Sequence, residues 1–367
     1  MSEKLFCSHC GAEIDSDEMF EFGGAVYCAD CIDELTTLCD CCNTRIRRGD
    51  VHGDGETELC ISCYDSYYTT CEDCGVLLHN DDAYFDDDND YPYCHSCYEK
   101  LQQASIKSYN YKPGPIFYGT GPLFMGVELE IDKGGEDIGN ADDLLDVANR
   151  GGEHIYCKHD GSISNGFEIV SHPMTLEYHK SNMNWQEVFE NAVSMNYRSH
   201  QTSTCGLHVH INRTAFGRTL DTQEDVISRI VYFVENHWNE LLKFSRRTEE
   251  NINRWANRYG ISTTAKDTYK NAKNKHKGRY VAVNLENYDT VEFRIFRGTL
   301  RYKTFIAVLQ LVYEICRFAI QLDDKGMEGL SWSEFVSLIP DDKPELIEYL
   351  KSKRLYINEI SSESEEI

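Results

Sequence analysis

The segment GVELEI, residues 126–131, decides the fold of the larger part of the chain. Its apolar residues alternate with Glu128 and Glu130, and successive side chains of a β-strand point to opposite faces of a sheet. The segment, extended to residues 124–131, is therefore predicted to be a strand with one apolar face and one face that carries carboxylates.

Three further segments alternate in the same way. His208 and His210 share one face of a predicted strand, Glu292 and Arg294 share one face of another, and Glu168 lies between apolar residues in a third. These three segments are residues 206–212, 290–296 and 166–171, and residues 279–285 are a further strand candidate. A single strand with one polar face is ordinary in a solvent-exposed sheet. Four strands whose polar positions are Glu, His and Arg indicate a binding site.

Apolar residues recur at helical spacing between and after these strands. Helices are predicted at residues 141–149, 184–196, 223–245, 303–321, 332–338 and 344–353. Because helices separate the strands without a strict βαβ order, we expect an α+β fold with an antiparallel sheet backed by helices. This domain is expected to span residues 123–355.

The polar face is expected to bind cations, because carboxylates gathered on one sheet face repel each other. Oxygen ligands with few imidazoles suit Mg²⁺ or Mn²⁺, and such ions complete their coordination with a further anion, typically a phosphate. Arg294, with Arg279 and Arg297 nearby in sequence, is a candidate for binding that phosphate. Residues 243–280 contain eleven Lys or Arg and three acidic residues, so this segment either faces phosphate or is a solvated basic loop.

In their order along the chain, these motifs resemble the glutamine-synthetase-like fold, and most closely the amidoligase branch of the carboxylate–amine ligases. The motifs are Glu128-Leu-Glu130, Asp160 and Glu168 eight residues apart, Gly206-Leu-His208-Val-His210, and Glu292-Phe-Arg294. The resemblance covers residues 123–320 and implies that the sheet is a glutamine-synthetase-like catalytic sheet.

The resemblance also implies ATP-dependent ligation, in which a carboxylate is converted to an acyl phosphate and an amine then displaces phosphate to form an amide or isopeptide bond. The expected ligands of one divalent ion are Glu130, Asp160 and Glu168, and those of a second are Glu128, His208 and Glu292. His210 is expected near the nucleotide, and Arg294, Arg279 and Arg297 near the transferring phosphoryl group. Asp160 stands where the synthetases have Glu, so its shorter side chain is expected to bind the ion directly or through water.

The first 100 residues have a different chemistry, because 13 of the 16 cysteines lie there. Twelve of them form six C-x-x-C pairs, and alternate pairs begin at residues 7, 39 and 71. A two-residue gap places two thiolates on one tight turn, and two such turns complete a tetrahedral Zn²⁺ site. Disulfides would require an oxidising compartment, and no export signal is evident, so three structural zinc sites are predicted.

The zinc ligands are expected to form sequential sets within an array that resembles tandem LIM-like or treble-clef fingers. The sets are Cys7, Cys10, Cys28 and Cys31; Cys39, Cys42, Cys60 and Cys63; and Cys71, Cys74, Cys94 and Cys97. A cross-braced pairing has the same spacing, and Cys41 could exchange roles with its neighbour. Residues 32–38 and 64–70 separate the units, where LIM domains have a two-residue junction. Each unit is too small for its own core, so metal binding is expected to supply most of its folding free energy.

The chain is acidic, with 36 Lys+Arg, 62 Asp+Glu and a net charge of −26 among 367 residues. Residues 1–100 contain 24 acidic and five basic residues, so nucleic-acid binding, which requires a basic face, is not expected. We expect the fingers to recruit a protein or peptide substrate, and a small-molecule amine or amino acid is an alternative substrate. Two other functions fit the motifs: a guanidino-kinase-like phosphotransferase, and a zinc-finger adaptor with a non-catalytic nucleotide-binding domain.

The domain boundaries follow from composition. The fingers are assigned to residues 1–100, the Pro- and Gly-containing residues 101–122 to a linker, and residues 356–367 to an acidic disordered tail. No apolar run approaches the roughly 20 residues of a membrane span, and no signal peptide is evident. A cytoplasmic protein without membrane association is therefore expected.

Overall fold

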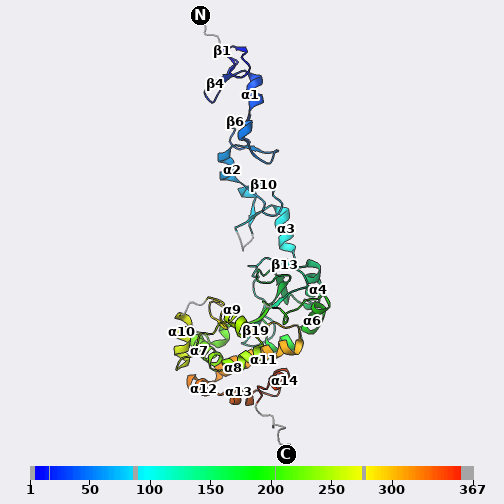
Figure 1. The fold of residues 1–367 in the computed structure, drawn as a ribbon, viewed down its shortest axis with the longest axis vertical. Helices are drawn as coiled ribbons and strands as arrows, with labels where there is room; N and C mark the ends of the chain where they lie inside the picture. Colours follow the sequence, from blue (N-terminus) through cyan, green and yellow to red (C-terminus); the bar gives the residue numbers. More distant parts are fainter. Residues whose placement is uncertain (1–4, 16, 86–89, 203, 275–277, 357–367) are drawn as a thin grey trace, which may run out of the picture. The chain divides into compact units, whose positions relative to one another are not determined.

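The computed structural model describes residues 5–15, 17–85, 90–202, 204–274 and 278–356. The chain forms two compact units, residues 1–103 and 104–367, whose elements Figure 1 traces in sequence order. All but the first residue of the predicted acidic tail, residues 356–367, lies outside the described residues.

The first unit contains three similar repeats, each built from two short hairpins followed by a helix. The first comprises β1 (Leu5–Phe6), β2 (Glu13–Ile14), β3 (Phe20–Phe22), β4 (Ala25–Tyr27) and α1 (Ala29–Leu35). The second comprises β5 (Thr36–Leu38), β6 (Arg45–Arg47), β7 (His52–Gly53), β8 (Glu58–Leu59) and α2 (Ile61–Tyr67). The third comprises β9 (Tyr68–Thr70), β10 (Leu77–His79), β11 (Tyr84–Phe85), β12 (Pro92–Tyr93) and α3 (His95–Gln103).

The repeats follow one another without a separate linker. Residues 32–38, expected as a separator, form the end of α1 and the whole of β5, which begins at Thr36 directly after Leu35. Arg48 of the second repeat donates hydrogen bonds of 3.2 Å to the carbonyl oxygens of Asp33 and Glu34 at the C-terminus of α1. A cation is favoured at this negative end of a helix, and the contact joins adjacent repeats.

The second unit is built around a seven-stranded sheet with the strand order β13-β15-β16-β14-β17-β19-β18. The strands are β13 (Ile106–Lys107), β14 (Met125–Ile131), β15 (Ile155–Lys158), β16 (Phe167–Ser171), β17 (Gly206–Asn212), β18 (Val283–Asn284) and β19 (Thr290–Arg297). Neighbours are antiparallel except for the parallel pair β13 and β15 at one edge. The predicted α+β class is confirmed, with a mixed rather than a wholly antiparallel sheet.

Residues 101–122 were expected to form a linker, and here the structure differs most from the prediction. These residues contribute β13 to the sheet. Tyr118 also bonds to a neighbouring segment: its N–H donates to the Pro173 carbonyl, and its carbonyl accepts from the Thr175 N–H, both at 3.0 Å. The boundary between the units accordingly falls between residues 103 and 104. The Pro and Gly residues shape an ordered edge of the domain rather than a free connector.

Helices lie beside the sheet in the second unit, as Figure 1 shows. They are α4 (Ile138–Ala148), α5 (Leu176–Ser181), α6 (Trp185–Ser194), α7 (Leu220–Asn236), α8 (Trp238–Ser245), α9 (Glu249–Trp255), α10 (Ala265–Asn274), α11 (Tyr302–Gln321), α12 (Asp324–Gly329), α13 (Trp332–Ser337) and α14 (Pro344–Ser352). The single helix predicted at residues 223–245 is two helices, α7 and α8, with a break at His237. The His237 ring donates a hydrogen bond of 2.9 Å to the Leu330 carbonyl, a tertiary contact that sequence periodicity does not show.

One continuous core lies between the apolar face of the sheet and the helices. Val127, Leu129 and Ile131 of β14 are at most 1% exposed, as the alternation in GVELEI predicts. Helix α11 has the length and apolar composition of a membrane span, contrary to the expectation that no segment does, with a mean hydropathy of 1.3 over its window. Because 78% of that window is buried inside the fold, core packing accounts for its composition.

Candidate active site

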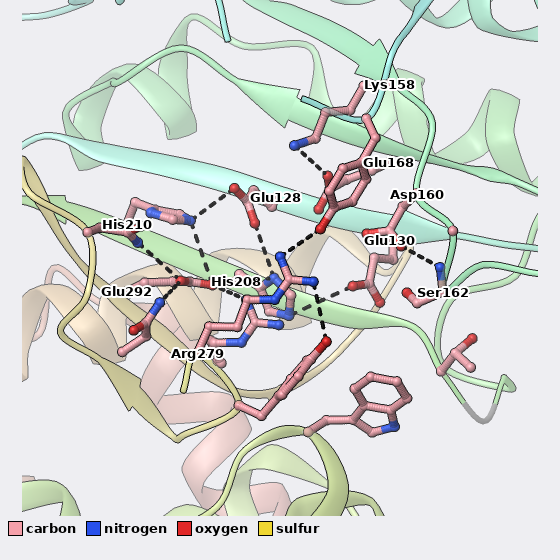
Figure 2. A pocket seen from close by; sticks show the side chains of 18 of the residues that line it. Glu128, Glu130, Lys158, Asp160, Ser162, Glu168, His208, His210, Arg279 and Glu292 are labelled. Atoms are coloured by element: carbon pink, nitrogen blue, oxygen red, sulfur yellow. Dashed lines mark hydrogen bonds and ion pairs between the residues drawn. The ribbon is translucent and has the colours of Figure 1, made fainter. Parts of the chain in front are cut away.

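The polar face of the sheet lines a cavity of about 810 Å³ (Figure 2). The predicted residues that line it are Glu128, Glu130, Asp160, Glu168, His208, His210, Arg279, Glu292 and Arg294. They come from β14, β16, β17 and β19 and from the loops before β16 and β18. Among the predicted site residues of this domain, Arg297 does not line the cavity.

Glu128 lies between the two histidines of β17. It is directly opposite His208 in the register of β14 and β17, and its Oε2 atom lies 3.2 Å from His208 Nδ1. Its other oxygen, Oε1, lies 3.1 Å from His210 Nε2. Burial alone would raise the pKa of Glu128, but His210 and His208 hold that pKa well below its usual range. The carboxylate is therefore ionised at neutral pH.

Glu292 is fixed by polar contacts on several sides. Its Oε2 atom accepts hydrogen bonds from Asn284 Nδ2 at 2.8 Å and Asn287 Nδ2 at 3.2 Å. Its Oε1 atom accepts from Arg294 and lies 3.6 Å from His208 Nδ1. Burial would raise the pKa of Glu292, but His210 in particular lowers it, so this carboxylate is also ionised.

Arg294 lies beside a β-bulge in β19. Leu207 pairs with Phe296 and Val209 with Phe293, so β19 has one residue more than β17 across this interval. The side chains of Ile295 and Phe296 can then both enter the core, where each is 1% exposed. The Nε atom of Arg294 is buried without a hydrogen-bond partner among the described residues, and it is thus available to a ligand.

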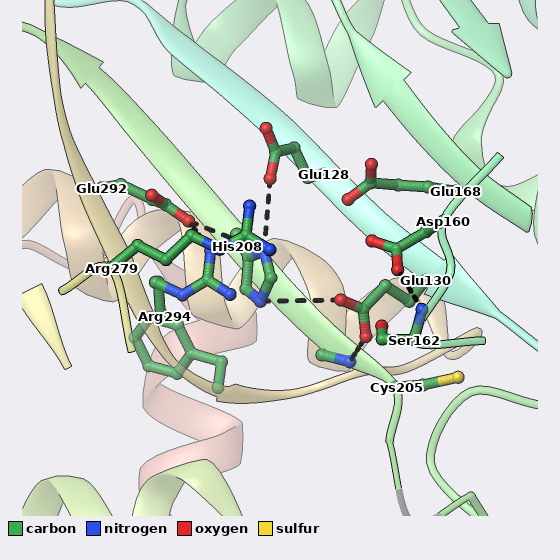
Figure 3. Close-up of polar contacts among 12 residues, drawn as sticks. Glu128, Glu130, Asp160, Ser162, Glu168, Cys205, His208, Arg279, Glu292 and Arg294 are labelled. Atoms are coloured by element: carbon green, nitrogen blue, oxygen red, sulfur yellow. Dashed lines mark hydrogen bonds and ion pairs between the residues drawn. The ribbon is translucent and has the colours of Figure 1, made fainter. Parts of the chain in front are cut away.

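Glu130 lies on the other side of His208, and Figure 3 shows these contacts. Its Oε1 atom lies 3.9 Å from His208 Nε2, and its Oε2 atom accepts a hydrogen bond from the Gly206 N–H. A Cβ atom at Gly206 would come within 2.4 Å of Arg247 Nη2 and 2.8 Å of His208 Nε2. Glycine at this position therefore leaves room for two side chains of the site.

Glu168 and Asp160 complete the carboxylate group beside β14. Glu168 is opposite Glu130 in the register and forms an ion pair of 3.2 Å with Lys158 Nζ. Burial, and next the charge of Glu128, raise the pKa of Glu168 well above its usual range. Asp160 Oδ1 accepts a hydrogen bond of 2.7 Å from the Ser162 N–H, which orients it at the cavity wall. A bound cation would relieve the repulsion among these carboxylates.

The donor set fits hard divalent cations. Ligand atoms of Glu128, His210 and Glu292 lie within 4.8 Å of one another, as do those of Glu128, Glu168 and His208. Carboxylate oxygens predominate, as Mg²⁺ and Mn²⁺ prefer. The buried His210 Nε2 atom lies 3.1 Å from Glu128 Oε1 and makes no hydrogen bond with good geometry among the described residues, so both atoms could bind one cation. His210, expected beside the nucleotide, thus lies in a possible ligand triad as well.

Several residues that line the cavity were not predicted from the sequence: Tyr109, Lys158, Arg247, Trp255, Tyr280, Asn284 and Asn287. Arg279 donates a hydrogen bond of 2.6 Å to the Tyr109 hydroxyl, within the segment expected to be a linker. The alternation of Lys158 with buried Cys157 in β15 was a usable signal, whereas no sequence pattern indicates Tyr109 or Asn287. The predicted basic segment does contribute to the cavity, through Arg247 and Arg279.

Cys205 precedes the histidine strand but has no apparent part in the site. Its side chain is 3% exposed and points away from the carboxylates in Figure 3. Burial raises the pKa of the Cys205 thiol to about 12, so the nucleophilic thiolate is disfavoured at neutral pH.

The cysteine clusters of the first unit fit zinc. Their Sγ atoms form the three predicted sequential groups, each within 4.8 Å, with Cys42 rather than Cys41 as a member of the second group. Cys10 and Cys28 are separated by 3.9 Å, and the corresponding pairs of the other groups by 3.8 Å. Tetrahedral Zn²⁺ with Zn–S bonds of about 2.3 Å requires a separation of about 3.8 Å. The cross-braced pairing does not match these groups.

Comparison with known proteins agrees with the resemblance of the sequence motifs. Residues 145–316 match the family described as "Putative amidoligase enzyme". This segment contains every predicted cavity residue except Glu128 and Glu130, and the match supports an enzyme of the carboxylate–amine ligase kind.

Among solved structures, the chain is similar to a bifunctional glutathione synthetase from Pasteurella multocida, at 13% identity and a TM-score of 0.37. The similarity covers 63% of this chain and 46% of the synthetase, so the chain spans less than half of that protein's length. Comparison with curated protein sequences finds no significant match.

Proposed function

We propose that the second unit is an ATP- and Mg²⁺-dependent carboxylate–amine ligase that forms an amide or isopeptide bond through an acyl phosphate. The observation that carries the proposal is the convergence of Glu128, Glu130, Glu168, Glu292 and two histidines in one cavity with Arg294. Such a group of buried carboxylates and imidazoles can bind divalent cations, and the arginine can bind the phosphate that accompanies them.

The proposed reaction has two steps. An oxygen of the substrate carboxylate attacks the γ-phosphorus of ATP, and ADP leaves. The amine nitrogen then attacks the acyl carbon, phosphate leaves, and the nitrogen loses a proton. Bound Mg²⁺ would neutralise charge on the phosphate oxygens and bring nucleotide and carboxylate together.

The chain's own residues would orient these groups. Arg294, held by Glu292, lines the cavity, where negative charge develops on the transferring phosphoryl group, and its buried Nε atom has no hydrogen-bond partner among the described residues. Arg279 is positioned by hydrogen bonds to the hydroxyls of Tyr109 and Tyr280 and can hold a second phosphate oxygen. The rings of Tyr280 and Trp255, 5.6 Å apart at the cavity wall, offer a stacking surface for adenine.

Trapping of the acyl phosphate tests this proposal without knowledge of the amine. The full chain is incubated with ATP, Mg²⁺, a mixture of amino acids and small peptides, and hydroxylamine, which converts an acyl phosphate to a hydroxamate. We expect hydroxamate, ADP and phosphate in equal amounts, and their loss in Glu292→Ala. A phosphorylated product without hydroxamate would instead support the guanidino-kinase alternative, and no ATP consumption with any mixture would support the adaptor.

We further propose that the fingers recruit a protein or peptide substrate. The first unit exposes large apolar side chains on an acidic surface, among them Phe6 at 55%, Ile61 at 51%, Tyr67 at 52% and Phe85 at 50% exposure. Apolar side chains surrounded by polar ones are typical of protein-binding surfaces, and the negative charge favours a basic partner. The test is the apparent KM for a peptide substrate, which should rise when residues 1–103 are removed.

A further inference from the structure

A second cavity of about 260 Å³ lies in the second unit, apart from the catalytic cavity. Its lining residues come from α11 and α14, from the turn after α8, and from the segments before β17 and after β19. The charged lining residues are Arg246, Arg301, Lys303, Lys353, Glu345 and Glu348. None of them lines the catalytic cavity, and the local excess of cations contrasts with the net charge of −26.

The two acidic residues of this cavity are engaged by other partners. Glu348 forms an ion pair of 3.0 Å with Lys303. Glu345 accepts a hydrogen bond of 2.6 Å from Gln310 and lies 3.7 Å from Lys180 Nζ. Among the residues that the structure describes, no carboxylate within 4.0 Å pairs with the side chains of Arg246, Arg301 or Lys353. Three cations of the cavity thus keep their charge uncompensated.

Arg246 has features that a purely structural role does not explain. It follows α8 with φ of 61°, in the left-handed region where glycine is the favoured residue at a helix end. Its Nε atom is buried without a hydrogen-bond partner among the described residues. Burial lowers the pKa of Arg246, Tyr349 opposes this, and Arg297 and Arg301 lower it further. An anion in the cavity would satisfy the orphaned donor and reduce this repulsion.

The N-terminus of α11 adds further donors beside these arginines. Arg301 is the N-cap residue of this 20-residue helix and makes no side-chain capping bond. The first N–H groups of a helix lack partners within the helix, and its N-terminus carries partial positive charge. The hydroxyl-bearing residues Thr299 and Thr304 line the same cavity, whereas the hydroxyl of the lining residue Ser352 donates to the Tyr349 carbonyl. Guanidinium groups, helix N–H groups and hydroxyls together can surround a tetrahedral oxyanion from several directions.

We infer that this second cavity is a phosphate-binding site, in which Arg246, Arg301, Lys353 and the N-terminus of α11 hold a phosphate dianion. A dianion with four oxygens matches the uncompensated charge and the number of donors better than a single carboxylate does. The inference goes beyond the proposed ligase activity and does not depend on it.

The first experiment is calorimetric titration of the full chain with inorganic phosphate and with phosphoserine, without added divalent cation. We expect binding that Arg301→Gln and Arg246→Gly each weaken about tenfold or more, because charge-assisted hydrogen bonds are lost. Lys325→Gln, an exposed site in α12, removes the same unit of charge and should leave affinity unchanged. Arg246→Gly should also keep or raise the Tm, because glycine adopts the positive φ without strain, so lost binding would not reflect unfolding.

The second arm separates this cavity from the catalytic one. Arg294→Gln should leave phosphate binding intact in the absence of divalent cations. The inference would be overturned if Arg294→Gln abolished binding while Arg301→Gln did not, or if Lys325→Gln weakened binding as much as Arg301→Gln. Tighter binding of phosphoserine than of inorganic phosphate would assign the site to a phosphate monoester, and equal binding would assign it to free phosphate. Absence of binding to both ligands would refute the phosphate assignment.

Discussion

At the scale of single residues, the charge of Glu292 holds the site together. It joins Asn284, Asn287, Arg294 and the two histidines, and its low pKa keeps it ionised. Glu292→Gln keeps the shape of the side chain but removes the charge, so we expect ATP turnover to fall about 100-fold or more. The Tm should change little, and turnover within threefold of the wild type would contradict this role.

Gly206 gives a second prediction, because its missing side chain leaves space for His208 and Arg247. In Gly206→Ala the new methyl group would displace these flexible ends, while the backbone has no need of a glycine conformation there. We expect the affinity for Mn²⁺ to fall about 10- to 100-fold, as when partners of metal ligands are altered. Gly329→Ala, where a Cβ atom meets nothing within 4 Å, is the matched control and should retain wild-type affinity.

The buried side chain of His179 should make the stability of the second unit depend on pH. It is fully buried, its Nε2–H donates to the Met125 carbonyl at 3.0 Å, and its Nδ1 accepts from the Trp185 indole at 3.1 Å. Burial lowers the pKa of His179 to about 4, below its value of about 6.5 in the unfolded chain. Between these two pKa values the unfolded state binds more protons than the folded state. The free energy of unfolding therefore falls by about 3 kcal/mol as the pH decreases from above 6.5 to about 4.

Chemical denaturation of the second unit between pH 7 and pH 4 measures this effect. His179→Phe removes the titrating group and should show a smaller fall in unfolding free energy over that range, although it is less stable at pH 7. The same pH dependence in both proteins would exclude His179 as its source.

At the scale of elements, the sequence predicts what is periodic and misses what depends on tertiary contacts. Strands β14, β17 and β19 were predictable because apolar and polar residues alternate over five positions, and β16 because Glu168 lies between apolar residues. The break between α7 and α8 was not, because the bond from His237 to Leu330 forms only in the fold. The bulge beside Arg294 was likewise hidden, since Ile295 and Phe296 read as an ordinary apolar pair.

The zinc-finger repeats give a prediction at the same scale. Each repeat has its own cluster of four thiols, so each should bind its ion independently. Cys63→Ser should reduce zinc from three to two ions per chain and unfold mainly the second repeat. Cys41→Ser is the control, because Cys41 lies outside the cluster. Zinc content by mass spectrometry measures both, and a loss of zinc in Cys41→Ser equal to that in Cys63→Ser would contradict the assignment.

At the scale of the whole molecule, the two units have separate sources of stability. We expect the first to depend on metal, because its cysteine clusters fit zinc, whereas the second has a continuous apolar core. A chain that begins at residue 104 should therefore fold and bind ATP with Mg²⁺, whereas one that begins at residue 123 should not, because it lacks β13 and the Tyr118 contacts. Circular dichroism and nucleotide titration distinguish them, and equal stability of both truncations would show that residues 104–122 are dispensable.

The central claim is that Glu128 and its neighbours bind paired divalent cations with the tail of a nucleotide. Anomalous diffraction from crystals grown with Mn²⁺ and a non-hydrolysable ATP analogue tests it most directly. We predict two manganese peaks in the catalytic cavity, bound by oxygen and nitrogen atoms of Glu128, Glu168, His208 and Glu292 and by the analogue's phosphates. Nucleotide density without manganese in this cavity, or manganese bound only elsewhere, would contradict the claim.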